Sequence, residues 1–348
     1  MFSIGILGFI VWSLVAPIYV FINKNLSICW NYLLLMSTQV RYNLMSMIQS
    51  AENNRLNKSF SMTTRQSSFD FTSFHLIYKS INQTQDKISD EFLQWFIGFS
   101  EGDGALLCTG TRPQFVLTQK ESAVLFMIQQ KLGFGSVHQF KGKTGNIFYR
   151  FMVLDLKNIL ILAHLFNGNL VLPNRVLQFK KWFTVLNTRP SLTNLLFEHP
   201  LIYSYKVITP TLQDYWICGF SDAEGCFNVN ITKRLAVSTG YRVTLRFILD
   251  QKNNFEALSI IRSAFGFGHV AQRSDNSGNY RLILNSLISI VPVRAYFSDF
   301  PLKSKKAVIF YKWCLVHDLI LNGEHLNVDG IVKIRKLKED IHRLHKDV

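Results

Sequence analysis

The sequence predicts an α+β protein built from two pseudo-symmetric αββαββα repeats joined in one chain. A nine-residue stretch, FIGFSEGDG at 96–104, recurs as ICGFSDAEG at 217–225, and matching residues of the two copies lie 121 apart. An aromatic helical pattern precedes each copy and a strand pattern follows it. The same order of predicted elements then recurs downstream of both copies, which indicates two structural repeats.

The elements of the first repeat are predicted from helix-capping residues and from the alternation of apolar and polar residues along strands. Ser89 is a good N-cap for a helix that ends at the first nine-residue stretch. Strands are predicted over 105–109 and 114–118, a helix over 121–132, a second hairpin over 136–140 and 148–153, and helices over 156–166 and 175–186. The second repeat is predicted to restart at Thr209-Pro210, and its first hairpin is longer.

These patterns divide the chain into five segments. Residues 1–22 are uncharged and mostly apolar, and residues 23–85 have the Ser, Asn, Gln and Thr content of a linker of low order. The first repeat is expected over 86–187, an inter-repeat linker over 188–208, and the second repeat over 209–348.

The charge balance suggests an anionic partner. The chain has 38 Lys and Arg against 23 Asp and Glu, a net charge of +15, which fits nucleic acid most simply. A basic membrane-peripheral or organellar protein is the alternative. The five cysteines form no C-x-x-C pair, and the nine histidines show no metal-ligand spacing, so a disulfide framework or a zinc site is not expected.

The repeated stretch itself carries the candidate chemistry. Gly98, Gly102 and Gly219 lack side chains, so the two helices could pack backbone against backbone and bring Asp103 and Glu224 together. Two adjacent ionised carboxylates repel unless a cation intervenes, and oxygen ligands suit a hard divalent ion. The alternative is that the glycines serve only packing and the acids are only solvated.

The two stretches resemble the signature motifs of the LAGLIDADG homing endonucleases, in the single-chain form with two motifs, and the resemblance extends over 88–340. It implies the LAGLIDADG fold, with the motif helices at the repeat interface and two antiparallel DNA-binding sheets. It also implies that Asp103 and Glu224 bind a catalytic divalent cation, taken as Mg²⁺, to which the carbonyls of Gly102 and Ala223 could add ligands.

The resemblance assigns roles to three further residues. Gln119 and Gln251 end matching strands where the family places a polar residue that orders the attacking water. Lys303 stands where the family often has an active-site lysine, and Leu172 aligns with it in the first repeat, so the two half-sites could differ in cutting rate. The alternatives are ordinary strand-end residues and a plain phosphate-binding basic run.

The sheet faces should read DNA. Residues that alternate along a strand share one face, and Arg and Asn suit bidentate contacts with guanine and adenine. The second repeat offers Asn228, Asn230, Thr232, Arg234, Arg242, Thr244, Arg246 and Arg273, with Lys305 as a phosphate contact. The first offers the less polar set Leu107, Thr109, Gln114, His138 and Gln139. A solvated sheet face is the alternative.

The apolar leader has two interpretations. A helix of 22 residues could span a bilayer, which would make it a membrane anchor. Residues 1–13, however, resemble a segment of mitochondrial cytochrome c oxidase subunit 1, and LAGLIDADG proteins are often encoded in organellar introns in frame with the upstream exon. We favour an exon remnant, which also points to mitochondria without a transit peptide.

The leading hypothesis is a monomeric, site-specific, metal-dependent DNA endonuclease that cuts double-stranded DNA at an intronless allele and promotes group I intron homing. The second is an RNA-binding maturase that assists splicing of its own intron RNA through the same basic surface. A membrane-anchored nucleoid protein is the third, and no protein partner is implied.

Overall fold

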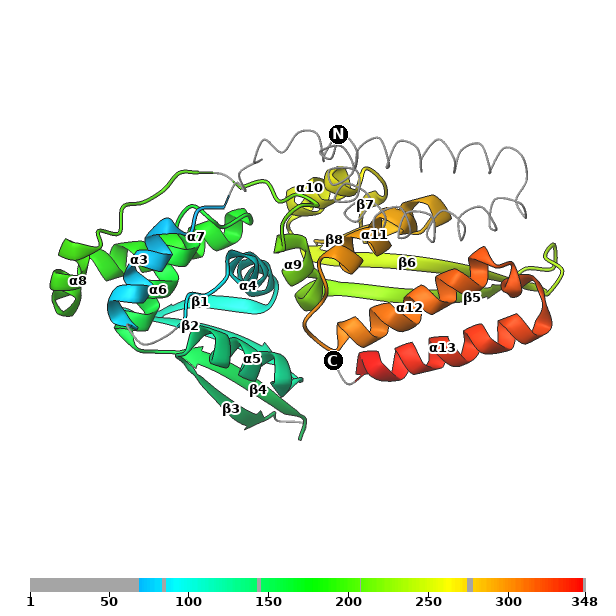
Figure 1. Ribbon diagram of the computed structural model, residues 1–348, viewed down its shortest axis with the longest axis horizontal. Helices are drawn as coiled ribbons and strands as arrows, with labels where there is room; N and C mark the ends of the chain where they lie inside the picture. The colour runs from blue at the N-terminus through cyan, green and yellow to red at the C-terminus, as the bar shows by residue number, and fades with distance from the viewer. Residues whose placement is uncertain (1–68, 83–85, 143–144, 207, 274–277, 347–348) are drawn as a thin grey trace, which may run out of the picture. The chain divides into compact units, whose positions relative to one another are not determined.

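The computed structural model describes residues 69–82, 86–142, 145–206, 208–273 and 278–346 (Figure 1). The expected leader, including its exon-like part, and most of the expected linker lie outside these described residues. Everything described belongs to one compact unit, Gln66–Val348. No helix within the described ranges is long and apolar enough to cross a membrane.

The first repeat has the predicted order of elements. Ser89 caps the first helix by accepting a hydrogen bond from the Phe92 N–H, and Gly133 ends the second helix in the left-handed conformation with φ 71°. The elements are α4 (Asp90–Asp103), β1 (Gly104–Thr109), β2 (Arg112–Gln119), α5 (Ser122–Leu132), β3 (Ser136–Lys141), β4 (Ile147–Val153), α6 (Leu156–Phe166) and α7 (Pro173–Asn187).

The second repeat follows the same plan, with a longer first hairpin as predicted. Its elements are α9 (Trp216–Glu224), β5 (Gly225–Lys233), β6 (Tyr241–Lys252), α10 (Phe255–Phe265), β7 (His269–Gln272), β8 (Asn279–Leu284), α11 (Leu287–Asp299), α12 (Lys306–Leu321) and a further helix, α13 (Val328–Lys346). The connection between the repeats contains the short helices η1 (Pro190–Leu192) and α8 (Thr193–Glu198).

Each repeat contains one four-stranded antiparallel sheet, in the orders β1-β2-β4-β3 and β5-β6-β8-β7. Alternate side chains of the central strands, such as β2 and β6, enter the core. Phe115 of β2 packs against Phe166 of α6 and Trp182 of α7, while Phe227 of β5 packs against Phe297 of α11 and Trp313 of α12. The helices therefore cover one face of each sheet, and the other face is left for the outward side chains.

Two expectations about element limits were wrong. Residues 72–81, assigned to the linker over 23–85, form helix α3 (Thr72–Ile81). Phe74, Ile77 and Tyr78 of this helix are buried at i, i+3 and i+4 spacing, and the Tyr78 hydroxyl donates to the Leu132 carbonyl. The surrounding polar composition concealed this short apolar stripe, so the first repeat begins earlier than predicted.

The second wrong limit is the start of the second repeat's motif helix. Thr209-Pro210 does not begin it, because α9 starts at Trp216. The Asp214 carboxylate accepts hydrogen bonds from the N–H groups of Thr211 and Trp216, which fixes a turn ahead of the helix.

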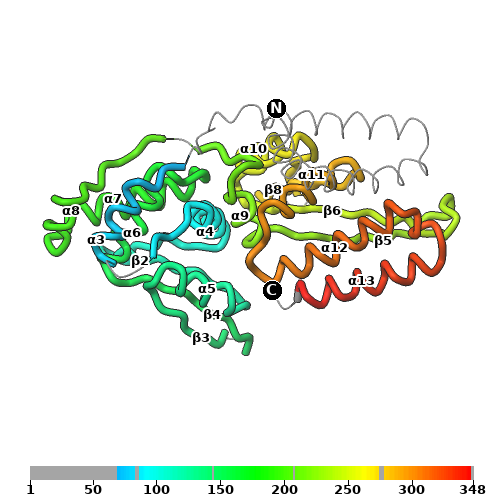
Figure 2. Tube along the Cα trace, in the orientation of Figure 1, coloured from blue at the N-terminus to red at the C-terminus, as the bar shows by residue number. Residues whose placement is uncertain are grey.

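Helices α4 and α9 pack backbone against backbone, as the glycines predicted. A Cβ atom on Gly98 would lie 2.1 Å from the Trp216 carbonyl oxygen, and one on Gly219 would lie 1.9 Å from that of Trp95. Both distances are far shorter than a non-bonded contact, so only glycine fits at either position. The two helices run side by side between the repeats (Figures 1 and 2).

Candidate active site

Two carboxylates stand at the adjoining ends of the motif helices. Asp103 is the last residue of α4, and Glu224 is the last residue of α9. Gln119 at the end of β2 donates from Nε2 to Asp103 Oδ2 over 2.5 Å, and Gln251 in β6 donates from Nε2 to Glu224 Oε1 over 2.9 Å. The antiparallel hairpins bring each glutamine back to its acid, so the structure pairs all four predicted residues with pseudo-symmetry.

The acids influence each other electrostatically. Burial raises the pKa of Asp103. Burial, and secondarily the negative charge of Asp103, raises the pKa of Glu224 to about 7. Because two neighbouring, half-buried carboxylates of like charge disfavour each other's ionisation, a bound cation would stabilise the doubly ionised pair.

A basic side chain from each repeat lies against the motif backbone. Lys306 Nζ donates to the Ala223 carbonyl over 2.5 Å and to the Ser221 carbonyl over 3.3 Å. Arg175 Nε donates to the Glu101 carbonyl over 2.9 Å and Nη2 to the Gly102 carbonyl over 3.1 Å. The carbonyls predicted as metal ligands, those of Gly102 and Ala223, therefore already accept hydrogen bonds.

Arg175 and Lys306 are structural counterparts. They lie 131 residues apart, the same spacing that separates Trp182 from Trp313. Both cations oppose the rise in the pKa of Asp103 and of Glu224. The sequence interpretation did not assign either residue, although the shared offset in the printed sequence could have revealed them.

The structure places the side chain of Lys303, the predicted active-site lysine, over two aromatic rings. Its ammonium group lies over the rings of Trp95 and Tyr215, 6.0 and 5.5 Å from their centroids. Its alignment with Leu172 was right, because the backbone N–H of Leu172 donates to Glu101 as that of Lys303 donates to Asp222. Leu172 and Lys303 precede α7 and α12. Arg175 and Lys306 lie in the first turns of these helices, and their side chains instead point toward the ends of the motif helices.

The sixth residue of each motif, Glu101 or Asp222, is a buried acid with a structural role that sequence reasoning missed. Glu101 accepts from the N–H groups of Val171 and Leu172 and from Trp216 Nε1. Asp222 accepts in the same way from the N–H groups of Lys303 and Ser304 and from Trp95 Nε1. Each acid thus ties the loop before α7 or α12 to the motif helix of the other repeat.

The outward face of the second sheet carries the predicted polar side chains. Antiparallel register pairs Asn228 with Arg246, Asn230 with Thr244 and Thr232 with Arg242. Arg246 donates from Nε and Nη2 to Asn228 Oδ1 over 3.0 and 2.8 Å, so this pair is already oriented.

Three predicted basic contacts of the second repeat lie off this row of strand pairs. Arg234 lies just past the end of β5, where its N–H donates to the Gly240 carbonyl. Arg273 follows β7 and lies 3.4 Å from the Asp250 carboxylate. Lys305 precedes α12, and its N–H donates to Glu121 Oε2 over 3.0 Å, which links the two repeats.

The first sheet presents all but one of its predicted residues outward. Register pairs Leu107 with Gln114 and Thr109 with Arg112 across β1 and β2, and His138 with Arg150 across β3 and β4. Gln139 instead pairs with Tyr149, on the parity of the inward residues Val137 and Phe151. This face is less polar than its counterpart, as the sequence predicted.

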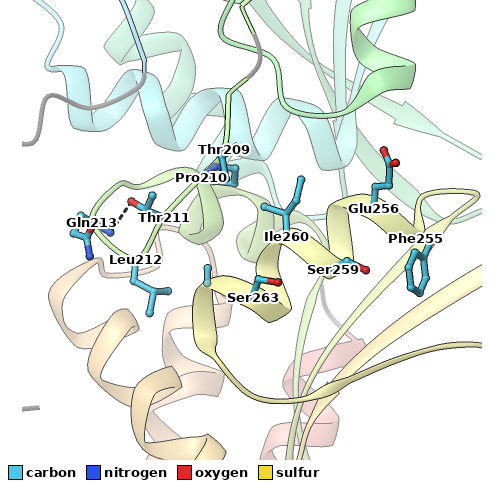
Figure 3. A pocket seen from close by; sticks show the side chains of 11 residues that line it. Thr209, Pro210, Thr211, Leu212, Gln213, Phe255, Glu256, Ser259, Ile260 and Ser263 are labelled. Carbon is cyan, nitrogen blue, oxygen red and sulfur yellow. Dashed lines mark hydrogen bonds between the residues drawn. The ribbon is translucent and has the colours of Figure 1, made fainter. Parts of the chain in front are cut away.

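The described residues offer no metal site of another kind, so the pair Asp103 and Glu224 is the candidate. Cys108, Cys218, Cys226 and Cys314 are free, and no described group of three or more His, Cys, Asp and Glu side chains could hold a metal. A groove of about 650 Å³ lies between residues 209–213 and α10, lined by residues such as Pro210, Leu212 and Ile260 (Figure 3). None of the predicted site residues lines it.

Sequence comparison finds a family and its relatives. The model of the LAGLIDADG endonuclease family matches residues 217–317. Probable intron-encoded endonuclease 4 of Neurospora crassa is 31% identical over 72% of this chain and 44% of its own length. An uncharacterized cox1 intron-2 protein of Schizosaccharomyces pombe is 25% identical over 84% and 85%, and intron-encoded RNA maturase bI4 of Saccharomyces cerevisiae is 25% identical over 66% and 33%. The chain thus spans less than half of the Neurospora protein.

Solved structures share the fold. The LAGLIDADG meganuclease I-AabMI, bound to uncleaved DNA, is 25% identical, with a TM-score of 0.57 over 71% of this chain and 98% of that one. The structure of I-SmaMI bound to an uncleaved DNA target with calcium ions is 17% identical, with a TM-score of 0.57 over 71% and 97%. At that identity the likeness concerns the fold alone.

Two αββαββα repeats, joined by glycine-packed helices that end in paired acids, define the double-motif LAGLIDADG architecture. With the family match and these relatives, the chain belongs to the LAGLIDADG endonuclease family.

Proposed function

We propose that this protein is a site-specific endonuclease that hydrolyses both strands of duplex DNA with the help of divalent metal. The observation that carries the proposal is the pair Asp103 and Glu224, which end the two packed motif helices and each accept a hydrogen bond from a glutamine. One such acid in each repeat suits a reaction that must occur once on each strand.

The residues at this position fit a hard divalent cation such as Mg²⁺. Two half-buried carboxylates supply hard oxygen donors, and the pKa of Glu224 is raised by burial and then by the negative charge of Asp103, which a bound cation would offset. When bound, the metal would activate water and stabilise charge on the phosphate and the leaving 3′ oxygen. Asp103 and Glu224 would hold it, with the carbonyls of Gly102 and Ala223 as additional oxygen donors.

The other polar groups around the acids take supporting roles in this proposal. Gln119 and Gln251 use Nε2 to hold the carboxylates, and the free oxygen of each amide could orient an attacking water. Arg175 and Lys306 place positive charge beside the site of reaction, where it stabilises the developing negative charge of the transition state. This proposal assigns no catalytic role to Lys303, because its ammonium group lies over two aromatic rings.

The outward sheet faces supply target recognition. Asn228, Arg246 and Arg242 carry side chains suited to base edges in the major groove, while Lys305 suits a phosphate. The DNA-bound state of the meganuclease I-AabMI, which shares the fold, supports duplex DNA as the partner.

The biological role proposed is intron homing in mitochondria. Relatives of this chain are named as intron-encoded proteins, one of them from a cox1 intron. A protein encoded in such an intron would cut the intronless allele and so promote copying of the intron into it.

An RNA-maturase activity is the second candidate. The observation that favours it is the relative named as an intron-encoded RNA maturase. The basic surface proposed for DNA would serve RNA as well, and retention of the acid pair favours cleavage as the first function.

The deciding experiment is cleavage of a plasmid that carries the intronless exon junction. We expect a double-strand break with Mg²⁺ and none with EDTA, and we expect Asp103→Asn and Glu224→Gln each to bind the junction without cutting both strands. If the wild-type protein binds the plasmid in Mg²⁺ but leaves it intact, the proposed nuclease activity is wrong. Accelerated splicing of the intron RNA by the same preparation would then support the maturase.

A further inference from the structure

The outward faces of the two sheets differ at matching positions. Leu107 in β1 and Asn228 in β5 are 121 residues apart, the spacing of the motifs, and are therefore counterparts. Leu107 is 45% exposed and pairs across the sheet with Gln114. Asn228 pairs with Arg246 and accepts its hydrogen bonds. An apolar side chain thus replaces a polar one at the same place.

A second pair of positions shows the same exchange. Phe140 and Phe148 face each other across β3 and β4, with ring centroids 5.7 Å apart. Their counterparts are Arg273 and Asn279, whose backbones pair at the same place in the second sheet. Both rings are only partly buried.

Arg150 extends this apolar pair with a charge. Its guanidinium carbon lies 4.8 Å from the Phe140 centroid and 5.2 Å from the Phe148 centroid. Stacking against two rings fixes the guanidinium in place at the outward face. The two phenylalanines therefore belong to a surface that also carries positive charge.

One outward row of the sheets is apolar in both repeats. Val116 and Met152 form an apolar row in the first sheet, and Ile248 and Ile283 form its counterpart in the second. At Leu107 and at the Phe140–Phe148 pair, in contrast, an apolar side chain in the first sheet stands where the second sheet has a polar one.

Apolar and polar side chains read different groups in the major groove. Apolar contacts recognise the C5 methyl of thymine, whereas Asn and Arg form bidentate hydrogen bonds with adenine and guanine. We propose that the first repeat recognises thymine methyl groups through Leu107 and the Phe140–Phe148 pair, while the second repeat recognises base edges by hydrogen bonding. This inference rests on the proposed function.

Duplex DNA fits this surface better than another protein does. Thr109, Gln114 and His138 share the face with the apolar positions, and Arg150 adds a fixed positive charge. The face is equivalent to the Asn- and Arg-bearing face of the second sheet, and the chain has a net charge of +15. A second copy of this basic chain would place like charges together.

The test compares thymine with deoxyuridine, which lacks only the C5 methyl. The target sequence is first selected by binding full-length protein to a randomised duplex library in EDTA. The same selection with Arg246→Ala then shows which half the second repeat contacts, because base preference is relaxed at a position in that half. Thymines are then replaced by deoxyuridine in one half at a time. We expect affinity to fall about fourfold for each contacted thymine in the first-repeat half, the effect of burying one methyl-sized group, and by less than twofold in the other.

Matched variants locate the contact. Leu107→Ala should bind thymine and deoxyuridine equally at one position, while Asn228→Ala should keep the full difference in the first-repeat half. Equal loss in both halves, or no loss in the first, would overturn the inference while leaving the nuclease intact. A dimer that Phe148→Ala dissociates, with no methyl effect, would instead assign the face to self-association. Failure to bind any duplex would count against the proposed function itself.

Discussion

Trp216 on α9 donates its indole N–H to the buried Glu101 carboxylate on α4, with the two atoms 2.6 Å apart. Trp95 on α4 returns the contact to Asp222 on α9 over 2.8 Å. The two repeats are therefore held together by a reciprocal pair of buried, charge-assisted hydrogen bonds as well as by the glycine contacts.

Trp216→Phe should weaken the repeat interface. The substitution keeps an aromatic ring but removes one donor to a buried carboxylate, which costs about 1–3 kcal/mol. We expect a correspondingly lower free energy of unfolding in urea, and a similar loss for Trp95→Phe. An unchanged unfolding midpoint for both variants would contradict a structural role for these hydrogen bonds.

Gly219→Ala should be more damaging than its single methyl group suggests. The added carbon would lie 1.9 Å from the Trp95 carbonyl oxygen, and backbone on both sides prevents relief by a rotamer change. Overpacking of this kind costs about 1–3 kcal/mol or more. Gly142→Ala is the control, since its new carbon would meet nothing nearer than 3.5 Å. Thermal unfolding that ranks the two variants equally would argue against close helix packing.

Metal-free protein should lose stability as the pH rises. Burial and the charge of Asp103 raise the pKa of Glu224 to about 7 from an ordinary 4.5, so the folded state holds a proton that the unfolded state has released. Stability from this group is complete below pH 4.5 and falls through about pH 7, by at most about 3 kcal/mol.

A variant and added Mg²⁺ test whether Glu224 causes this pH dependence. Glu224→Gln should flatten part of the pH dependence, and Glu101, whose pKa burial also raises to about 7, should retain the rest. Mg²⁺ should restore stability to the wild type above pH 7 but not to Glu224→Gln, as chemical unfolding at several pH values will measure. A Mg²⁺ effect of equal size on both proteins would place the metal elsewhere.

Lys306→Met and Arg175→Met should each slow cleavage of one strand more than the other. Each cation belongs to one repeat, and losing such a charge at a reacting centre costs about a hundredfold in rate. Single-turnover nicking of end-labelled duplexes measures both strands separately. Lys303→Ala is the control and should leave both rates within a few fold, because its ammonium group lies over Trp95 and Tyr215.

Arg246→Ala should relax base preference at one position, whereas Lys305→Ala should weaken binding to all sequences. A bidentate base contact contributes about 1–3 kcal/mol of discrimination. A lost phosphate contact instead lowers the salt dependence of binding by about one unit. Titration against single-base target variants at several salt concentrations distinguishes them, and a uniform loss for Arg246→Ala would make its contact a phosphate.

Sequence reasoning predicted the parts of this molecule that repeat. The motif offset pointed to Asp103 and Glu224, and the family resemblance at the ends of matching strands pointed to Gln119 and Gln251. The glycines within the motif helices predicted the contact between those helices. Sequence reasoning did not predict which lysine side chain contacts the motif helix, because that depends on where the helix α12 begins. Lys303 and Lys306 belong to one basic run, and only the structure shows that Lys306 is the one whose ammonium group binds the carbonyls of Ser221 and Ala223 beside Glu224.

The helix α3 was missed for a different reason. Its stripe of Phe74, Ile77 and Tyr78 occupies barely two turns within a polar region, too little to change the average composition. Buried acids such as Glu101 were also invisible, because their partners are backbone N–H groups brought in by the tertiary fold.

The backbone contact between α4 and α9 fixes the separation of the two reacting centres without any intervening layer of side chains. Under the proposed function, changes on the outer sheet strands would alter which sequence is bound while the spacing of the two cuts stays constant. A lineage of such proteins could drift to new targets and still leave the same kind of DNA end, and an engineer could exchange one half's recognition surface without rebuilding the catalytic centre.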